Sequence, residues 1–229
     1  SRIKKYVKDK PKSLIKLKDK TILENLLDIF NLKKINKILI IVIFNKKKII
    51  QEFGNVFKKK KIEYVFNKNY KTTNNMYSLY LTKNYINEDI VFVSSDLFLD
   101  SKIKNKLRRL KKRNFILISK NKSFFKDNDI TKVNIKNNYI NLLGKKKFSG
   151  KVTAVAPGMC GMSKNNFKKF LKISKYFIDK KKYQFGYNEV LKVLIKQKLK
   201  FFAFDPGNYL WRNINKEHDV KFMRKKLRV

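Results

Sequence analysis

Short apolar runs alternate with amphipathic stretches along much of this chain. Residues 38–44 form a continuous, mostly β-branched run, which is typical of a strand buried on both faces. In residues 21–31 the apolar side chains recur at the spacing of one helical face, with Thr21 as a possible N-cap and Glu24 three residues later. The pattern therefore predicts a helix followed by a buried strand near the amino end.

The same two patterns continue through the chain and define its expected fold class. Further strands are predicted at residues 62–66, 90–94, 115–119, 151–156 and 200–204, and helices at 74–85, 101–111, 164–177, 187–196 and 216–227. In residues 129–141 apolar and polar side chains alternate only loosely, so the strand pattern there is weak. Alternating strands and helices favour an α/β protein with a Rossmann-like, mixed but mostly parallel sheet and helices on both faces.

Length and cysteine content narrow the class further. A chain of 229 residues fits one domain with a real core. None of its apolar runs approaches the roughly 18 residues that a membrane-spanning helix needs. Cys160 is the only cysteine, so an intrachain disulfide is impossible, which fits a reducing cytoplasm. With one Cys and one His, a metal would need oxygen ligands, which favours Mg²⁺.

The net charge of the chain is typical of nucleic-acid binders, but the kind of basic residue argues against that function. The formal net charge is +41, a value typical of nucleic-acid binders. However, the basic residues are 51 Lys and only 7 Arg, whereas phosphate and base recognition draws on the bidentate guanidinium. The 25 Asn and the many Ile and Phe match the amino-acid usage of an AT-rich genome. We interpret most of the charge as solvated surface.

Three polar positions could carry chemistry. Asp96 follows the predicted strand at 90–94, and ligands of open α/β sheets bind at the carboxyl ends of strands, where this carboxylate could hold Mg²⁺. The alternative is an N-cap, for which Asp100 is better placed. Lys12 lies beside Pro11 and suits a nucleotide phosphate. Asn215 lies between Trp211 and a predicted helix, where it either approaches Asp96 or caps the helix.

Four motifs occur in the same order and with similar spacing as in nucleotidyltransferases of the sugar-phosphate and phosphocholine type. They are Lys10-Pro11-Lys12-Ser13-Leu14, the polar run at residues 67–79, Ser95-Asp96, and Trp211-x-x-Ile214-Asn215-x-x-x-Asp219. The pattern Tyr-x-Thr-Thr-Asn-Asn-x-x-Ser-Leu at residues 70–79 most resembles the phosphocholine and 2-aminoethylphosphonate cytidylyltransferases. The resemblance implies a GT-A-like fold and transfer of CMP from CTP to such a small phosphorylated acceptor, with release of pyrophosphate and Mg²⁺ as cofactor.

The resemblance also implies roles on the nucleotide side of the site. Arg2 would contact the triphosphate, and Lys12 would stabilise the charge that develops at the α-phosphate. Asp96 matches the metal-binding aspartate, and Asn215 occupies the second metal position.

On the acceptor side, the resemblance implies binding by the polar run and by one acid. Thr73, Asn74, Asn75 and Ser78 belong to the run that surrounds the base and the acceptor's phosphate. Glu189 resembles an acidic position that faces a substrate ammonium group.

The chain departs from the family pattern in several places. The first strand and the glycine-rich loop of the family would precede Ser1, so we expect a single nucleotidyltransferase domain that is N-terminally incomplete. Residues 1–119 would form its nucleotide-binding half, and 120–229 its acceptor-binding half with a C-terminal helix. Asn215 replaces an Asp, and Pro157-Gly158 falls where Gly-Glu is usual. Two alternatives stay open: a sugar-1-phosphate acceptor, and a non-catalytic, basic RNA-binding remnant of this fold.

Overall fold

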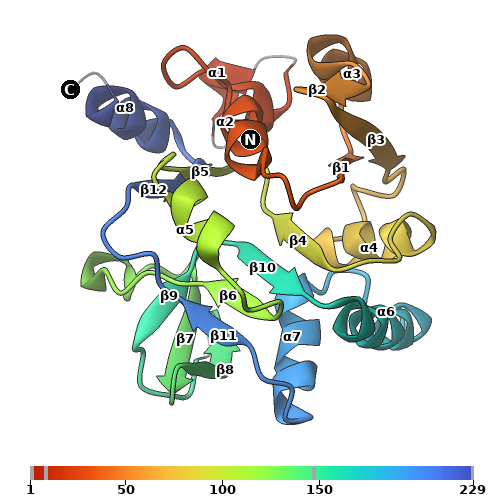
Figure 1. Cartoon of the computed structure of the whole chain (residues 1–229), viewed down its shortest axis with the longest axis vertical. Coiled ribbons are helices and arrows are strands. Elements are labelled where there is room, and N and C mark those ends of the chain that lie inside the picture. Colours follow the sequence, from red (N-terminus) through yellow and green to blue (C-terminus); the bar gives the residue numbers. More distant parts are fainter. Residues whose placement is uncertain (1–2, 8–9, 146–147, 228–229) are drawn as a thin grey trace. The chain divides into compact units, whose positions relative to one another are not determined.

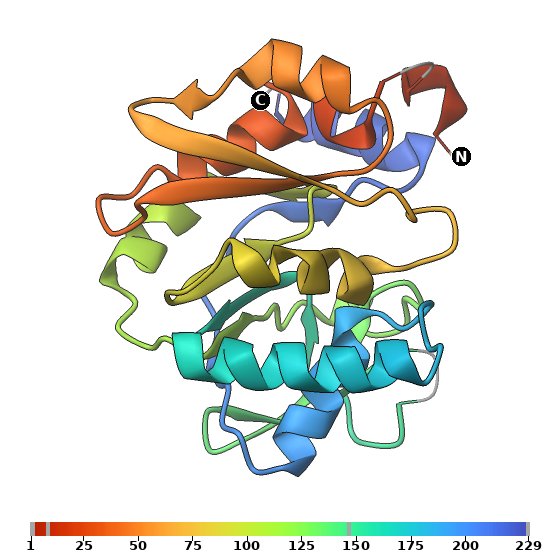
Figure 2. The ribbon, with the colours of Figure 1, turned by 90° about the vertical axis from the view of Figure 1, so that its right-hand side faces the viewer.

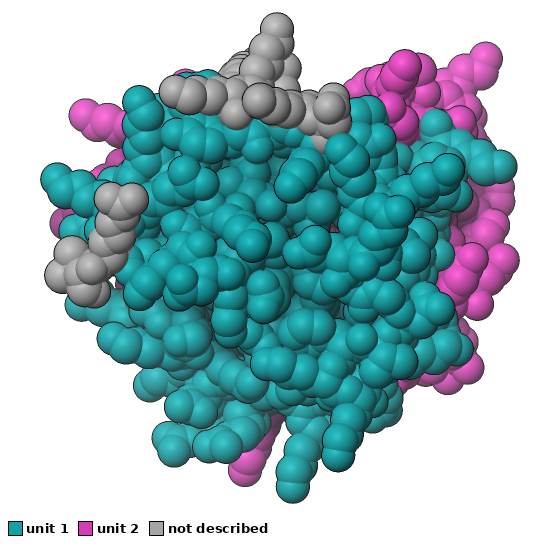
Figure 3. All heavy atoms as spheres, turned by 90° about the horizontal axis from the view of Figure 1, so that it is seen from above, with its two compact units in different colours: residues 1–68, 94–110, 208–229 teal, residues 69–93, 111–207 magenta. Residues whose placement is uncertain are grey.

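The computed structural model describes residues 3–7, 10–145 and 148–227. The chain groups into two compact units, coloured in Figure 3. Unit 1 comprises residues 1–68, 94–110 and 208–229, and unit 2 comprises residues 69–93 and 111–207. The chain passes from unit 1 to unit 2 and back twice, so neither unit is one continuous half of the sequence. The expected division near residue 119 stays a prediction.

Unit 1 contains helices around two small groups of strands (Figure 1). Its described elements are α1 (Lys4–Val7), η1 (Lys12–Leu14), α2 (Ile22–Phe30), β1 (Lys37–Val42), α3 (Lys46–Phe53), β2 (Val56–Phe57), β3 (Lys60–Phe66), β5 (Leu97–Leu99), α5 (Ile103–Arg109), β12 (Trp211–Asn213) and α8 (Glu217–Lys226). The strands pair in the orders β1-β3-β2 and β12-β5.

Local sequence signals account for several of these elements. Helix α2 begins as predicted, because the Thr21 hydroxyl accepts a hydrogen bond from the backbone N–H of Glu24 at 3.1 Å. Strands β1 and β3 are parallel, with Ile38 opposite Ile62. The turn between β2 and β3 is Lys58-Lys59 with φ of 46° and 69°, and two positive φ values are typical of a two-residue type I′ hairpin.

Two apolar clusters hold unit 1 together. One joins η1, α2, β1, β3 and α3 through Leu14, Leu23, Leu27, Ile40, Val42, Ile49 and Ile62. The other joins α1, β5 and α8 through Ile3, Val7, Ile15, Leu17, Ile22, Phe98, Ile214, Val220 and Met223. The second cluster includes residues from both ends of the chain, so it fixes the segment after Lys12 and the segment after β12 in one framework.

Unit 2 contains a seven-stranded sheet with the order β4-β10-β6-β11-β8-β7-β9. Figures 1 and 2 show α4, α6 and α7 grouped together beside its strands. The elements are α4 (Asn75–Tyr80), η2 (Leu81–Asn84), β4 (Ile90–Val93), β6 (Phe115–Leu117), η3 (Lys122–Phe124), β7 (Thr131–Lys136), β8 (Tyr139–Gly144), β9 (Ala154–Ala156), β10 (Met159–Met162), α6 (Lys164–Asp179), α7 (Tyr187–Lys196) and β11 (Phe202–Phe204).

The α/β class is confirmed, but the described strands are less parallel than the alternation predicts. Only β1–β3 and β6–β11 pair in parallel, and the other described pairs are antiparallel. Short reversals cause the difference. Asn137 and Asn138, with φ of 49° and 64°, form a two-residue hairpin that turns β7 directly into β8. A two-residue connection permits only antiparallel pairing.

Strands β6 and β10 of unit 2 approach each other closely at a glycine. Gly161 of β10 lies opposite Phe115 of β6, and a Cβ at Gly161 would fall 2.2 Å from the Phe115 ring. The helices contribute large buried rings, including Phe167 and Phe170 of α6, which stack with centroids 5.9 Å apart. Within the described part of the chain, none of the helices is long and apolar enough to cross a membrane.

Candidate functional site

Asp96 and Asn215 lie at the same end of the β5–β12 ladder in unit 1. Leu97 is paired with Asn213, and the ladder continues one residue further because the backbone N–H of Ile214 donates to the carbonyl of Asp96 at 2.8 Å. Asp96 precedes β5 directly, and Asn215 follows Ile214. The predicted strand at 90–94 corresponds to β4 and the predicted helix at 101–111 to α5, but the sequence pattern does not predict β5 between them.

Lys12 joins this pair from the other end of the sequence. Its ammonium donates to Asn215 Oδ1 at 3.2 Å across a sequence separation of 203 residues. Lys12 begins η1, whose Leu14 is buried in the cluster with α2 and β1. Both partners of the hydrogen bond are half-buried. The structure thus brings together in unit 1 three of the residues that the sequence had nominated.

The turn into α8 carries a fourth polar residue, Asp219. This side chain is 4% exposed and accepts backbone N–H bonds from Asn215 at 3.0 Å and Lys216 at 2.7 Å. Its other oxygen accepts from Arg212 Nε at 2.7 Å and lies 2.7 Å from Nη2 of the same guanidinium. Asp219 is part of the Trp211 motif, but the sequence pattern assigns it no role. Its position three residues after the predicted start of a helix is the one signal that indicates capping.

The donor chemistry of this cluster fits Mg²⁺. Asp96 offers a carboxylate and Asn215 an amide oxygen, and Mg²⁺ in nucleotide enzymes is commonly held by one or two such groups together with substrate phosphates. The oxygen of Asn215 has a second lone pair besides the one that meets Lys12. Over the described ranges, no group of three or more His, Cys, Asp or Glu could hold a metal by itself. Water and substrate phosphate oxygens would complete the shell of a Mg²⁺ held by Asp96 and Asn215.

In unit 2, the nominated asparagines connect the start of α4 to the loop before α7. Asn74 caps α4 by accepting from the N–H of Asn75 at 2.7 Å, and its amide donates to the carbonyl of Gln184 at 3.1 Å. The backbone N–H of Tyr187, the first residue of α7, donates to Asn75 Oδ1 at 2.8 Å. Gln184 in turn donates to the carbonyl of Thr72 at 2.7 Å.

The remaining nominated residues are Thr73, Ser78, Glu189 and Arg2. Thr73 donates through its hydroxyl to the carbonyl of Asn69 at 2.8 Å, and Ser78 lies one turn into α4, half-buried. The Glu189 carboxylate on α7 accepts from Lys192 at 2.9 and 3.0 Å, so its charge is already offset by a cation. Arg2 lies outside the described residues.

A small cavity of about 10 Å³ in unit 2 adjoins Gly158, Tyr187 and Asn188. This volume holds about one water molecule. Asn188 donates to the Thr131 hydroxyl at 2.8 Å on its wall. Cys160 also contacts the cavity, but burial raises the pKa of its thiol well above the usual value. The thiol therefore stays protonated and is a poor nucleophile.

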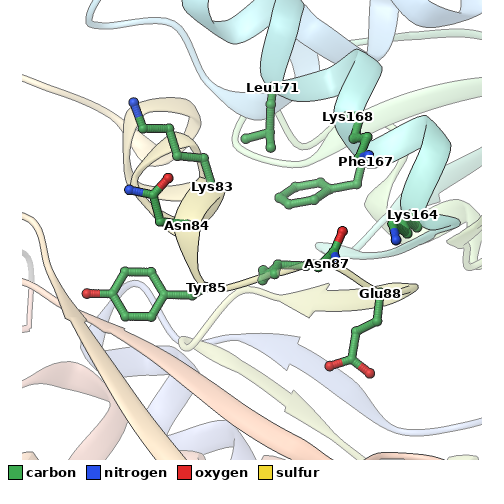
Figure 4. A pocket seen from close by; sticks show the side chains of 10 residues that line it. Lys83, Asn84, Tyr85, Asn87, Glu88, Lys164, Phe167, Lys168 and Leu171 are labelled. Atoms are coloured by element: carbon green, nitrogen blue, oxygen red, sulfur yellow. The ribbon is translucent and has the colours of Figure 1, made fainter.

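A larger hollow of about 250 Å³ lies between α6 and the segment from η2 to β4. Figure 4 shows Phe167 and Leu171 projecting into it, whereas Tyr85 and Glu88 point away from them. The labelled polar side chains Lys83, Glu88 and Lys164 point in different directions (Figure 4), and the lining includes none of the residues nominated from the sequence. We assign no chemistry to it.

The fold is that of the nucleotidyltransferases of the nucleotide-diphospho-sugar type. The inositol-1-phosphate CTP transferase of T. maritima superposes with a TM-score of 0.78 at 18% identity, covering 99% of this chain and 91% of that chain. The CTP:phosphocholine cytidylyltransferase of Streptococcus pneumoniae superposes with a TM-score of 0.77 at 19% identity, covering 99% and 94%. At these identities the likeness establishes the fold.

A sequence relative points to the same class of protein. The chain is 29% identical over 109 residues to the choline-phosphate cytidylyltransferase of Streptococcus pneumoniae. The match covers 48% of this chain and 46% of the relative, so it spans about half the length of the curated protein. No family model matches the chain. Its neighbours in sequence and in structure are nucleotidyltransferases, which confirms the resemblance seen in the motifs.

Proposed function

We propose that the protein transfers CMP from CTP to a small phosphorylated acceptor, phosphocholine or 2-aminoethylphosphonate, and releases pyrophosphate. The observation that carries this proposal is the Lys12–Asn215 hydrogen bond beside Asp96. This bond joins a cation to an amide oxygen one residue beyond the backbone partner of Asp96, which supports a site for phosphoryl chemistry on a triphosphate. The names of the sequence relative and of the two structural neighbours described above support CTP as the nucleotide.

The proposed reaction needs no covalent enzyme intermediate. An oxygen of the acceptor's phosphate or phosphonate attacks the α-phosphorus of CTP, the bond from that phosphorus to the bridging oxygen breaks, and pyrophosphate leaves. The Lys12 ammonium donates to an α-phosphate oxygen and offsets the charge that develops there, while Asn215 keeps the ammonium in position. Asp96 and Asn215 would hold Mg²⁺, which supplies Lewis-acid stabilisation of the phosphate oxygens.

The acceptor side of the proposal rests on unit 2. Thr73, Asn74, Asn75 and Ser78 surround the base and the acceptor's phosphate in this reading. The Asn75 side chain uses its oxygen on Tyr187, and its NH₂ group is the end that donates to a ligand. For Glu189 to face a substrate ammonium, that ammonium must compete with Lys192. Lys192→Met is therefore expected to lower the KM for an amine acceptor.

The test measures pyrophosphate release from CTP with each acceptor, using the purified protein with whatever residues its gene supplies before Ser1. Lys12→Met is expected to lower kcat about 100-fold, the usual effect of removing one group that stabilises developing charge. Asp96→Asn is expected to lower turnover and weaken its Mg²⁺ dependence. Lys18→Met removes an exposed lysine of the same segment and should leave turnover unchanged.

Two results would contradict the proposal. One is an absence of pyrophosphate release with every nucleotide and acceptor pair, and the other is full activity in Asp96→Asn. Activity with inositol 1-phosphate or a sugar 1-phosphate, but not with either amine, would favour the alternative acceptor class, for which the inositol-phosphate transferase neighbour is the supporting observation.

A further inference from the structure

Asp219 makes more contacts than the start of a helix requires. A capping acid at this position satisfies the N–H of the residue that precedes the helix, which here is Lys216. Asp219 also accepts from the N–H of Asn215, one residue outside the cap, at 3.0 Å. Its second oxygen accepts from Arg212, which lies on β12. One buried carboxylate thus joins a strand, a turn and a helix.

The turn that these bonds fix is the one that presents Asn215 to Lys12. The backbone of Asn215 is held from one side by Asp219, and the neighbouring Ile214 is held from the other by its bond to the Asp96 carbonyl. With both neighbouring contacts in place, the Asn215 side chain leaves the backbone in one direction, where its oxygen meets the Lys12 ammonium at 3.2 Å.

Arg212 completes the arrangement electrostatically. Asp219 is 4% exposed, and a buried carboxylate without a cation is costly. The guanidinium contacts it through Nε and Nη2, a two-point contact that fixes orientation as well as charge. Arg212 thus offsets the charge of Asp219, while Lys12 bonds to the neutral amide of Asn215.

We propose that Asp219, held by Arg212, is a positioning residue that acts through Asn215 to set the location of the Lys12 ammonium. This inference rests on the proposed function for its catalytic consequence, but the positioning itself does not depend on turnover. Both oxygens of Asp219 are directed at protein donors, namely the N–H groups of Asn215 and Lys216 and the guanidinium of Arg212. Its removal should therefore change the rate of the chemical step and leave substrate binding largely intact.

The first test compares steady-state constants. Asp219→Asn keeps the shape of the side chain but replaces one acceptor oxygen by an NH₂ group that must face N–H donors. We expect kcat to fall about 10- to 100-fold, as for a catalytic group displaced by a fraction of an ångström to an ångström, while the KM for CTP changes less than about threefold. Glu217→Gln is the matched control, because it removes the same charge from the same helical turn.

A double-mutant cycle separates positioning from general support of the fold. If Asp219 acts only through Asn215, then Asp219→Asn in an Asn215→Ala background should cost less than about twofold in kcat. A purely structural role predicts the same 10- to 100-fold loss in both backgrounds and would overturn the inference. Arg212→Lys keeps the charge but loses the two-point contact, so it tests the same link in a milder variant should Asp219→Asn fold poorly.

The second test needs no activity. Trace acetylation with acetic anhydride, followed by peptide mass spectrometry, measures the reactivity of Lys12 in the protein without substrates. Loss of its hydrogen bond in Asn215→Ala should raise the Lys12 labelling rate about threefold. Asp219→Asn should raise it to the same level, and Glu217→Gln should not.

The two tests fail in different ways. If wild-type protein turns over no substrate pair but Asp219→Asn still exposes Lys12 to acetylation, the proposed function fails and the positioning inference stands. If the Lys12 labelling rate in Asp219→Asn equals that of wild type, the positioning inference is wrong whatever the protein catalyses.

Discussion

Asn75→Ala tests whether the polar run at residues 67–79 has a structural task of its own. The N-cap of α7 is Gly186, which has no side chain to satisfy the first N–H groups of the helix. Asn75, 112 residues away, accepts from the N–H of Tyr187 at 2.8 Å and thus does the capping from another helix. Truncation to Ala leaves that donor without this acceptor.

The expected cost follows from the geometry. Loss of a helix cap costs about 0.5–2 kcal/mol. The Asn75 bond is short but lies at the surface, where water can replace the lost oxygen, so we expect about 1 kcal/mol. That free energy corresponds to roughly a fivefold increase in local opening of the first turn of α7. Amide hydrogen exchange at Tyr187 should accelerate by about this factor, and urea unfolding should report the same loss.

Asn75→Asp separates the cap from a ligand contact. A carboxylate still accepts from Tyr187 and is favoured at a helix amino end, so stability should stay within about 0.5 kcal/mol of wild type. Asn165→Ala, which changes an exposed Asn in the first turn of α6, is the matched control. Unchanged hydrogen exchange at Tyr187 in Asn75→Ala would refute the capping argument. Low turnover in a stable Asn75→Asp would show that this side chain lies near a ligand, which the lost NH₂ group bound or the added charge repels.

Two further predictions concern stability. Gly161→Ala puts a Cβ 2.2 Å from the Phe115 ring and should lower the free energy of unfolding by about 1–3 kcal/mol. In the control Gly144→Ala the new Cβ meets its nearest atom at 3.4 Å, so the loss should be smaller. The rate of Cys160 thiol labelling in urea measures both losses, and equal rates in the two variants would contradict the packing argument. Burial raises the pKa of Asp28, but hydrogen bonds from Lys20 and Lys58 lower it further, so the folded pKa lies below the usual value. The carboxylate therefore contributes stability above the unfolded pKa of about 3.9, and this stability is lost as the pH falls through the folded pKa. Asp28→Asn should cost at most about 1 kcal/mol at pH 7, because both lysines are half exposed, and a urea-unfolding deficit that persists at pH 2 would contradict this reasoning.

Elements whose signals are local could be predicted from the sequence. Helix α7 has the predicted bounds, and α2 begins at the predicted Thr21 cap, because periodicity and capping depend on neighbouring residues only. The two-residue turn at Asn137-Asn138 also carries a readable signal, since Asn adopts positive φ more easily than most residues. The Lys58-Lys59 turn has no such signal, and neither hairpin is among the predicted elements.

The site depends on contacts that no local pattern contains. Strands β5 and β12 have three residues each, too few for a periodicity, and each is defined only by pairing with the other. The resemblance to nucleotidyltransferases nominated Lys12 and Asn215 together, but the bond between them depends on the whole framework of unit 1. The role of Asp219 could not be predicted, because it depends on which backbone N–H groups of the turn lie within reach of its carboxylate.

In each unit, nominated residues lie next to the start of a helix, and this affects how mutants should be interpreted. In unit 1, Asp219 satisfies N–H groups before α8, and Asn215 reaches Lys12 from the turn so fixed. In unit 2, Asn75 satisfies the first N–H of α7. A loss of turnover on truncating any of them is therefore expected even if the residue never meets a ligand. Only an isosteric change that keeps the N–H bond, such as Asn75→Asp, distinguishes a group that binds substrate from one that places its neighbours.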